Sequence, residues 1–310
     1  MGTIGTEHQR LRREGAAVRP GLNAGARRET MMELAPPLAA KYAHLTQILK
    51  PMQRVAVAFS GGVDSTTLLS AACETLGSSG VLALLSVAPS VPRREVAQAR
   101  ALADSLHVRL VSLQTNELKQ PAYAANDENR CYFCKNTLFH DCLRVAQAQG
   151  IAHVLYGAIL DDLGDRRPGM RAARELGIRG PLAEAQFTKE DVRQLARAWK
   201  LPVAEKPASA CLASRIASGI RVTVDNLSQV ERAEDFLHDL GFRQVRVRHH
   251  ADDTARIEVD PAEIPQVAAR AAEITAFLEG VGYRYVSLDL RGYRSGVVPA
   301  NDNLATARQT

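Results

Sequence analysis

The chain has 310 residues, 46% hydrophobic and 24% charged, a composition typical of a folded protein of about two domains. It has no uncharged apolar run of about 18 residues and no signal-peptide pattern at its start, which argues against a membrane span or export and favours the cytoplasm. The net charge of +5 is concentrated at one end, since residues 1–30 carry +3 and the remainder only +2. The body therefore lacks the dense basic face that nucleic-acid binding needs.

The pattern of residues 1–37 indicates a mobile N-terminal tail, because it is rich in Arg, Gly and Ala and has no apolar period long enough for a packed helix. From about residue 38, apolar runs typical of buried strands alternate with stretches typical of helices. Strands are predicted at 55–59, 81–87, 108–113 and 153–156, and helices at 38–50, 66–76, 94–106 and 130–149. This alternation predicts an α/β protein with a doubly wound parallel sheet, in a domain spanning residues 38–221.

Residues 161–221 are rich in Pro and Gly and predict mostly loops, with one helix at 189–199. A different pattern begins at residue 222. It predicts helices at 227–240 and 262–278 and strands at 244–248, 255–259 and 285–290. We therefore expect a smaller α+β domain over residues 222–303, followed by a short tail at 304–310.

The turn Ser60-Gly61-Gly62-Val63-Asp64-Ser65 lies between the first strand and the next helix, where open parallel sheets bind ligands. Its adjacent glycines allow backbone N–H groups to approach phosphate oxygens, its serines add hydroxyl donors, and the helix N-terminus adds partial positive charge. Asp64 is suited to hold a Mg²⁺ ion that bridges the phosphates. The turn has neither the lysine of a Walker A motif nor the spacing of a dinucleotide fingerprint, so it predicts a phosphate site of another type.

Five cysteines in a chain without an export signal point to metal binding or thiol chemistry rather than to disulfides. Cys131 and Cys134 are spaced to lie on one helix face, as two ligands of one metal centre would. Cys73 and Cys142 are in phase with apolar positions of their helices. We expect these two to pack in the core.

Cys211 lies in a segment of small residues flanked by Lys206 and Arg215, whose positive charges favour a thiolate. If this segment reaches the other pair of cysteines, three thiolates converge. Three cysteines with one open position suit a [4Fe–4S] cluster, whereas structural zinc normally has four protein ligands. A zinc site completed by His140 and a lone reactive Cys211 without metal are the alternatives.

The turn at 60–65 resembles the pyrophosphate-binding loop, or PP-loop, of the ATP pyrophosphatases, a superfamily that includes GMP synthetase and tRNA-thiolating enzymes. The resemblance implies that Ser60, Gly61, Gly62, Val63, Asp64 and Ser65 bind ATP and hold its pyrophosphate. The bond between the α and β phosphates is then cleaved, and a substrate is adenylated. Positive dipoles around the leaving pyrophosphate would stabilise the transition state.

Longer stretches resemble one family within that superfamily, the LarE-type ATP-dependent sulfur transferases. These stretches are CYFCK at 131–135, RRPGMRAARELGIRGPLAE at 166–184, FTKEDVRQLAR at 187–197, KPASACLASRI at 206–216 and GYRSG at 292–296. The resemblance, which covers about residues 40–303, implies adenylation of a carboxylate of pyridinium-3,5-dicarboxylate mononucleotide, sulfur transfer to the same carbon and release of AMP. The product would be a thiocarboxylate used to assemble the nickel-pincer nucleotide.

The resemblance also implies roles for single residues and for the smaller domain. It implies catalytic roles for Cys211, Asp64 and Arg215, with Mg²⁺ held by Asp64. Members that have only the cysteine matching Cys211 sacrifice its sulfur, whereas members that also carry the CxxC use all three cysteines to hold a [4Fe–4S] cluster. This chain carries the CxxC, so we expect cluster ligation by Cys131, Cys134 and Cys211, with sulfide or another sulfur donor as co-substrate. The smaller domain is expected to contribute to substrate binding and to a homo-oligomer, with a hexamer as one form.

Arg246 and Arg248 are two residues apart on a predicted strand, so both guanidinium groups point to one face and are suited to grip a substrate phosphate. The resemblance supports that role. A solvated sheet face with ordinary surface arginines is the alternative. His249 and His250 are predicted as surface residues at the end of the strand.

Two positions depart from the family pattern, Ile159 after the fourth strand and Arg166, where the family tends to have tyrosine. A tRNA sulfurtransferase of the same superfamily is the main alternative enzyme, but it would need a basic RNA-binding surface. An amidotransferase-type synthetase gives no reason for the three cysteines. A nucleotide sensor with structural zinc is the non-enzymatic alternative.

Overall fold

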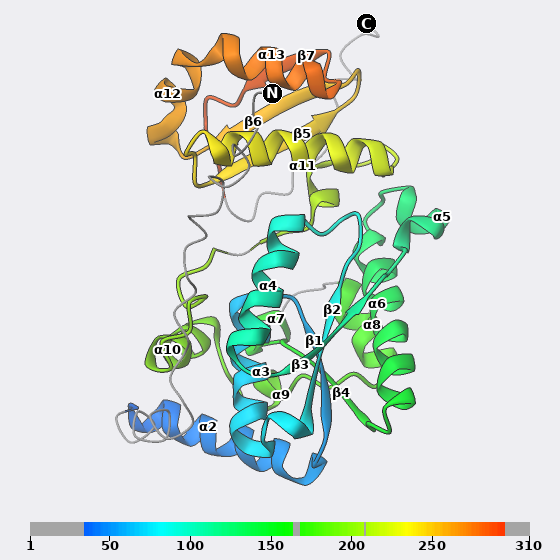
Figure 1. Ribbon diagram of the computed structural model, residues 1–310, viewed down its shortest axis with the longest axis vertical. Helices are drawn as coiled ribbons and strands as arrows, with labels where there is room; N and C mark the ends of the chain where they lie inside the picture. The colour runs from blue at the N-terminus through cyan, green and yellow to red at the C-terminus, as the bar shows by residue number, and fades with distance from the viewer. Residues whose placement is uncertain (1–33, 164–167, 208, 295–310) are drawn as a thin grey trace, which may run out of the picture.

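The structure is a computed structural model, which describes residues 34–163, 168–207 and 209–294. In these ranges the chain forms a four-stranded sheet and a three-stranded sheet, each packed against its own helices (Figure 1). Most of the predicted N-terminal tail, Arg166 and the predicted tail at 304–310 lie outside the described residues.

The larger sheet has four parallel strands in the order β3-β2-β1-β4. The strands are β1 (Val55–Phe59), β2 (Val81–Ser86), β3 (Arg109–Leu113) and β4 (His153–Tyr156), each within one residue of its prediction. Since all four strands run in one direction, their carboxyl ends and the loops that follow them meet at one edge of the sheet.

Helices cover both faces of this sheet, because successive side chains of β1 point to opposite faces and are apolar on both. Val55, Val57 and Phe59 pack into one core, and Ala56 packs into the other. The first core is closed by α2 (Pro36–Leu49), α3 (Val63–Leu76), α4 (Arg93–Ser105) and α10 (Lys189–Ala198), and the second by α6 (Arg130–Ala148) and α8 (Pro168–Glu175). The α/β class and the parallel sheet wound on both faces are confirmed.

Short elements fill the connections around the sheet. They are η1 (Lys50–Met52), η2 (Ser78–Gly80), η3 (Glu117–Lys119), α5 (Pro121–Ala124), α7 (Leu160–Leu163), α9 (Pro181–Glu184) and η4 (Leu212–Arg215). The prediction of loops is wrong for α8, whose Ala172 and Ala173 are fully buried against α6. Pro168 and Gly169 are loop signals in a sequence, but proline is well tolerated in the first turn of a helix.

The smaller sheet has the order β5-β6-β7, with β5 (Val245–His250) antiparallel to β6 (Thr254–Val259) and β7 (Tyr285–Leu288) parallel to β6. Its core is closed by α11 (Val224–Asp239), α12 (Ile264–Ala269) and α13 (Ala271–Val281), with η5 (Pro261–Glu263) before α12. The single helix predicted at 262–278 is wrong, because the backbone leaves the helical region at Arg270. Helix α11 starts earlier than predicted, since Thr223 and Asn226 form a capping box.

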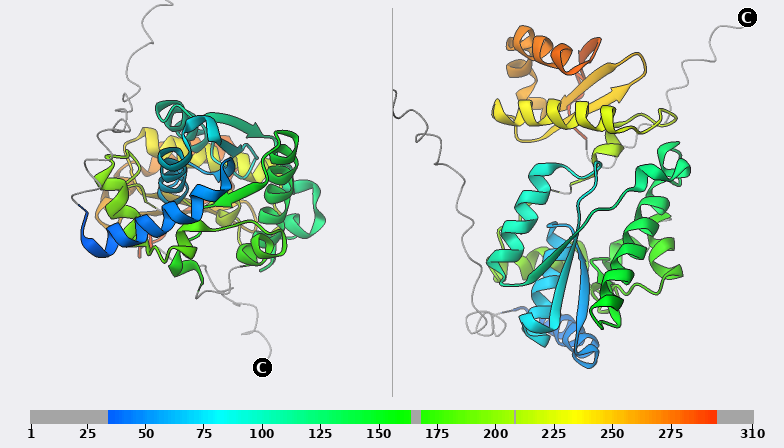
Figure 2. Two further views of the ribbon diagram at one scale, coloured as in Figure 1. Left: turned by 90° about the horizontal axis from the view of Figure 1, so that it is seen from below. Right: turned by 45° about the vertical axis from the view of Figure 1, so that its right-hand side comes forward.

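The smaller unit lies over the carboxyl ends of β1 to β4. Figure 2 shows α11 across that end of the larger unit, where α4 and the start of α6 also lie. Loops of the larger sheet and residues of the smaller one are therefore neighbours. No helix in the part of the chain that the structure describes is long and apolar enough to cross a membrane.

Candidate active site

A cavity of about 620 Å³ opens at the carboxyl edge of the larger sheet. Its wall includes the 60–65 turn and the three cysteines singled out in the sequence, Cys131, Cys134 and Cys211. Cations from three separate elements, Lys135, Lys189 and Lys206, also line it. The fold therefore brings together residues that are up to about 150 positions apart in the chain.

The 60–65 turn is held closed by its own serines. The Ser60 and Ser65 hydroxyls are 3.1 Å apart, and the Ser65 hydroxyl also donates to the Gly62 carbonyl at 3.2 Å. Gly61 has a φ of +70°, and a Cβ there would lie 2.8 Å from the Cβ of Ala99 on α4, so this position requires glycine. The N–H groups in the first turn of α3 have no acceptor within the helix and are available to an anion.

Asp64, in the first turn of α3, is paired with Lys189 at the start of α10. The Lys189 ammonium donates to both carboxylate oxygens, at 2.8 and 2.7 Å. The end of β4 packs tightly beside them, because a Cβ on Gly157 would lie 2.8 Å from the Ser65 nitrogen. Asp64 thus faces the cavity already neutralised by a lysine. A cation could replace this lysine beside the carboxylate, or a phosphate could replace the carboxylate beside the lysine.

Lys189 is a site residue that the sequence analysis did not assign. Its backbone N–H donates to Asp161 at 2.7 Å, and the Thr188–Asp191 capping box fixes the helix start. The capping pattern Thr-Lys-Glu-Asp is visible in the sequence, but the partner of Lys189 lies 125 residues away. Only the fold shows that this lysine belongs to the site.

The three cysteines line the same cavity, and Cys131 and Cys211 are near enough to Cys134 to influence the pKa of its thiol. Burial, and then the nearby Cys211, raises the pKa of the Cys134 thiol to about 12. Across the described ranges, no three His, Cys, Asp or Glu side chains are grouped closely enough to hold a metal ion. His140 is exposed and does not line this cavity. Cys142 is fully buried in the core, as predicted, and Cys73 packs against the other core.

A hydrogen-bond network joins the two cysteine-bearing segments. Arg130, directly before Cys131, donates to the buried Asn126 side chain and, at 2.7 Å, to the Ala213 carbonyl. Asn126 in turn donates to the carbonyls of Ile216, Ala217 and Ile220 at 2.8–3.3 Å. The start of α6 is therefore fixed against the segment that carries Cys211.

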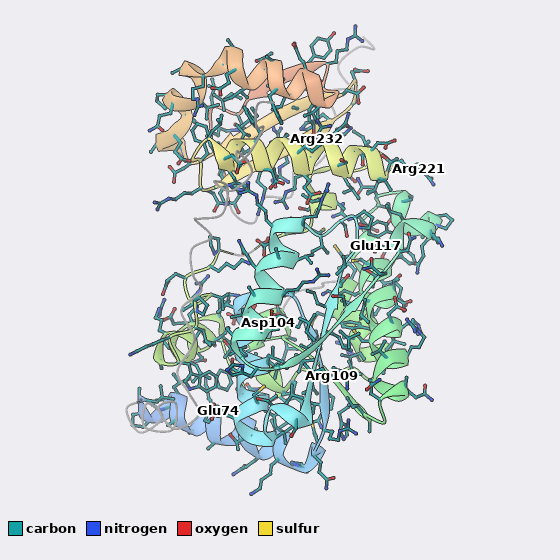
Figure 3. The ribbon with its side chains drawn as sticks, in the orientation of Figure 1. Glu74, Asp104, Arg109, Glu117, Arg221 and Arg232 are labelled. Atoms are coloured by element: carbon teal, nitrogen blue, oxygen red, sulfur yellow. The ribbon has the colours of Figure 1, made fainter. Side chains whose placement is uncertain are left out.

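A buried acid supports the Cys211 segment from the other side. Ser90 accepts a hydrogen bond from the Leu212 N–H at 2.8 Å and donates its hydroxyl to Glu117, which is 3% exposed. Figure 3 shows Glu117 at the end of the sheet that faces the smaller unit, whereas Arg109, at the start of β3, lies toward the other end. Glu117 was not assigned from the sequence, where it appears as an ordinary acidic residue after a strand.

Arg215 is buried and fully engaged by protein groups. It forms a two-pronged ion pair with Glu234 of α11, at 2.8 and 3.0 Å, and donates to the Cys211 carbonyl at 3.0 Å. Lys206 is likewise paired, with Glu95 of α4. Both cations that flank Cys211 in the sequence therefore have a carboxylate partner, and Arg215 fixes the backbone of Cys211.

A second cavity, of about 750 Å³, lies between α4, the segment around Lys206 and the start of β5. Arg246 lines it, is only 9% exposed, and has no ion pair within the ranges that the structure describes. Its guanidinium lies over the ring of Tyr293, 5.3 Å from the centroid, and burial together with Arg215 lowers the pKa of Arg246. The carboxylate of Glu234 is near enough to offset part of this effect but forms no ion pair with Arg246, and a buried cation without a direct ion pair is well suited to bind an anionic group.

The neighbouring residues of β5 are more engaged. Arg248 is two residues from Arg246 on the strand and therefore lies on the same face. Unlike Arg246 it already has partners, because it donates to Glu258 at 3.1 Å and to the Ser214 carbonyl at 3.0 Å. The prediction of surface histidines is wrong for His249, which is 5% exposed with its ring 5.6 Å from that of Tyr283. The strand continues to His250 and turns His249 inward.

No model of a known protein family matches the chain. A pyridinium-3,5-bisthiocarboxylic acid mononucleotide synthase of Lactiplantibacillus plantarum is 39% identical over 271 residues, which are 87% of this chain and 97% of that protein. An uncharacterised protein of Synechocystis sp. is 44% identical over 262 residues, or 84% and 97% of the two chains. An uncharacterised protein of Methanocaldococcus jannaschii is 26% identical over 246 residues, or 78% and 92%.

Proposed function

We propose an ATP-dependent sulfur transfer for this chain, which belongs to the family of the pyridinium-3,5-bisthiocarboxylic acid mononucleotide synthase of Lactiplantibacillus plantarum. In this proposal the enzyme adenylates a carboxylate of pyridinium-3,5-dicarboxylate mononucleotide and replaces the activated oxygen with sulfur. The products are a thiocarboxylate, AMP and pyrophosphate. The product would serve nickel-pincer nucleotide synthesis.

The observation that supports this proposal most directly is one cavity lined both by the 60–65 turn and by three cysteines. A turn of adjacent glycines before a helix is suited to bind phosphates, and thiols are suited to carry sulfur. An enzyme that only adenylates needs the turn alone. The shared cavity favours sulfur transfer to the adenylated carbon.

The first step would take place at the 60–65 turn. A carboxylate oxygen of the substrate attacks the α phosphorus of ATP, and pyrophosphate leaves. The N–H groups of the turn and the start of α3 would stabilise the charge that develops on the leaving pyrophosphate, and Lys189, which lines the same cavity, would add its own charge. Asp64, once released by Lys189, would be the residue that holds Mg²⁺, which when bound would neutralise phosphate charge.

The second step needs a sulfur atom close to the activated carbon. Sulfur attacks that carbon, and AMP leaves with the oxygen of the former carboxylate. Cys131, Cys134 and Cys211 would be the residues that hold a [4Fe–4S] cluster, because thiols are the ligands of such clusters and all three line one cavity. Since the described side chains are not grouped closely enough to hold a single metal ion, ligation would have to bring the three thiols together. When bound, the cluster would supply an exchangeable sulfide.

Two other reactions are alternatives for the same site. In one, Cys211 donates its own sulfur and is converted to dehydroalanine, with no cluster. In the other, a tRNA base is the substrate. The net charge of only +2 outside residues 1–30 argues against RNA, since RNA binding would need a dense basic surface.

Incubation of the anaerobically purified protein with ATP, Mg²⁺, sulfide and the dicarboxylated pyridinium mononucleotide tests the proposal. Mass spectrometry should show a mononucleotide in which sulfur has replaced oxygen, together with AMP, while the mass of the protein is unchanged after several turnovers. A protein that loses one sulfur for each product formed would instead indicate sacrifice of Cys211. Absence of AMP and of any thiolated mononucleotide would refute sulfur transfer to this substrate.

A further inference from the structure

Two cavities of the molecule share one wall. The cavity at the 60–65 turn and the cavity at Arg246 are both lined by Pro92, Glu95, Lys206, Pro207 and Ser209. If a mononucleotide places its phosphate on Arg246 and its reacting carboxylate near the α phosphate of ATP, we expect its pyridinium ring to lie beside this wall, because the wall lines both cavities. Residues of the wall are then in contact with the part of the substrate that carries the carboxylates.

Lys206 is the one cation among these five shared residues, and it is firmly positioned. Its side chain is only 17% exposed, its ammonium is paired with Glu95, and it donates to the Gln98 side chain at 3.1 Å. Its backbone is fixed from α10, because Arg193 donates to the Lys206 carbonyl at 3.1 Å and to the Ala204 carbonyl at 2.6 Å. The position of the lysine is therefore set by two helices on different sides.

The ammonium of Lys206 has hydrogen-bonding capacity left for a ligand. A lysine has three N–H donors, and Glu95 and Gln98 are the acceptors found for it in the described part of the chain. Glu95 balances the charge of the lysine and orients its ammonium in a partly buried wall, where an isolated charge would be costly. An incoming carboxylate would form a charge-assisted hydrogen bond with the remaining donor.

We propose that Lys206 binds a carboxylate of the mononucleotide where the substrate passes from the Arg246 cavity to the 60–65 turn, with Glu95 and Gln98 as positioning residues. This inference rests on the proposed function and names a contact with the substrate within it. In this proposal two cations recognise different parts of the substrate. Arg246 recognises the phosphate that any mononucleotide has, and Lys206 recognises the carboxylate that distinguishes this substrate.

The test compares two ligands that share a ribose phosphate and a pyridinium ring. One is the dicarboxylated pyridinium mononucleotide, and the other is nicotinamide mononucleotide, which has a neutral amide instead of carboxylates. Isothermal titration calorimetry, with α,β-methylene ATP present, gives the Kd of each for the wild-type protein and for Lys206→Met. We expect the substitution to raise the Kd of the dicarboxylated ligand by about tenfold or more and that of the amide ligand by less than about twofold.

Two further variants keep the test independent of folding. Lys206→Arg retains the charge and should keep the Kd of the dicarboxylated ligand within about threefold of wild type. Lys50→Met, an exposed lysine before β1, is the matched control and should change neither Kd. Equal loss of both ligands in Lys206→Met, or no loss of the dicarboxylated ligand, would overturn the role of Lys206. If the wild-type protein binds neither mononucleotide, the proposed function itself is refuted, and the proposed contact between Lys206 and the substrate is refuted with it.

Discussion

Asp64 is the residue on which the ATP-dependent step depends most directly. It lies in the first turn of α3, faces the cavity and is paired with Lys189, so that one carboxylate is available to exchange a lysine for Mg²⁺. We predict that Asp64→Ala lowers ATP-dependent pyrophosphate release by about 100-fold or more, because the residue that would hold Mg²⁺ near the leaving group is lost. A coupled pyrophosphate assay measures this, with the exposed and distant Asp104→Asn as control. Undiminished release in Asp64→Ala would remove the proposed Mg²⁺ role.

The three cysteines of the cavity make a second prediction at this scale. After anaerobic reconstitution with iron and sulfide, we expect Cys131→Ala, Cys134→Ala and Cys211→Ala each to hold much less iron per chain than the wild-type protein. Cys142→Ala is the control, because Cys142 is fully buried in the core on the same helix as the CxxC pair. Iron analysis and visible absorption measure the result. A variant that keeps its full iron content would show that its cysteine is not a ligand.

At the scale of the element, the start of α10 carries Lys189 to the site, and Asp191 fixes that start. Burial opposes the charge on Asp191, but hydrogen bonds from Lys41 and Thr188 outweigh it and lower the pKa of Asp191 below its usual value. A carboxylate with a lowered pKa stabilises the fold above the pKa of the unfolded chain, about 3.9, and this contribution is lost as the pH falls through the folded pKa.

We therefore predict that Asp191→Asn lowers the melting temperature at pH 7 and that the difference from wild type narrows as the pH falls below about 4, the pKa of an aspartate in the unfolded chain. The loss at pH 7 should be about 1–2 kcal/mol, as for removal of a helix cap with an ion pair. Thermal unfolding followed by circular dichroism at several pH values measures it. Glu190→Gln, an exposed neighbour in the same turn, is the control. A difference that is constant with pH would contradict the assigned role of the Asp191 charge.

Elements with a strong local pattern could be predicted from the sequence. The strands of the larger sheet are continuous apolar runs, and α6 is long enough for its period to be read, so both agree with the structure within one residue. Helix α8 could not be predicted, because its eight residues begin with Pro and Gly and its stability comes from two alanines packed against α6. The predicted helix at 262–278 failed because Arg270, at which it breaks, carries no local signal.

The site was predictable to the extent that its residues lie in local motifs. The 60–65 turn and the CxxC pair each have a recognisable spacing, and both do line one cavity. The fold is needed to identify three further site residues. The roles of Lys189 and Glu117 depend on partners that are distant in the sequence, and the role of Arg246 depends on its burial. Asp64 lies 125 residues from Lys189, Glu117 is buried against a loop from another strand, and Arg246 is buried with no ion pair among the described residues.

At the scale of the whole molecule, the ion pair between Arg215 and Glu234 joins the Cys211 segment to α11 of the smaller unit. The two side chains are 2% and 8% exposed, and Glu234 also accepts the Val247 N–H at 3.0 Å, so the pair connects the cysteine to β5 as well. Removal of one partner leaves the other charge buried, which costs about 3–5 kcal/mol in comparable pairs. We predict a loss of this size in Arg215→Met, measured by urea unfolding.

The double variant Arg215→Met/Glu234→Gln should recover part of that loss, since the glutamine is neutral and its amide oxygen can still accept the Val247 N–H. Arg94→Ala is the comparison, because Arg94 also joins the two units but is 44% exposed, and such pairs contribute about 0–1 kcal/mol. If Arg215→Met were no more destabilising than Arg94→Ala, the buried pair would not be what holds the two units together. Iron analysis of the same variants after reconstitution then tests whether the smaller unit positions Cys211 near Cys131 and Cys134 of α6.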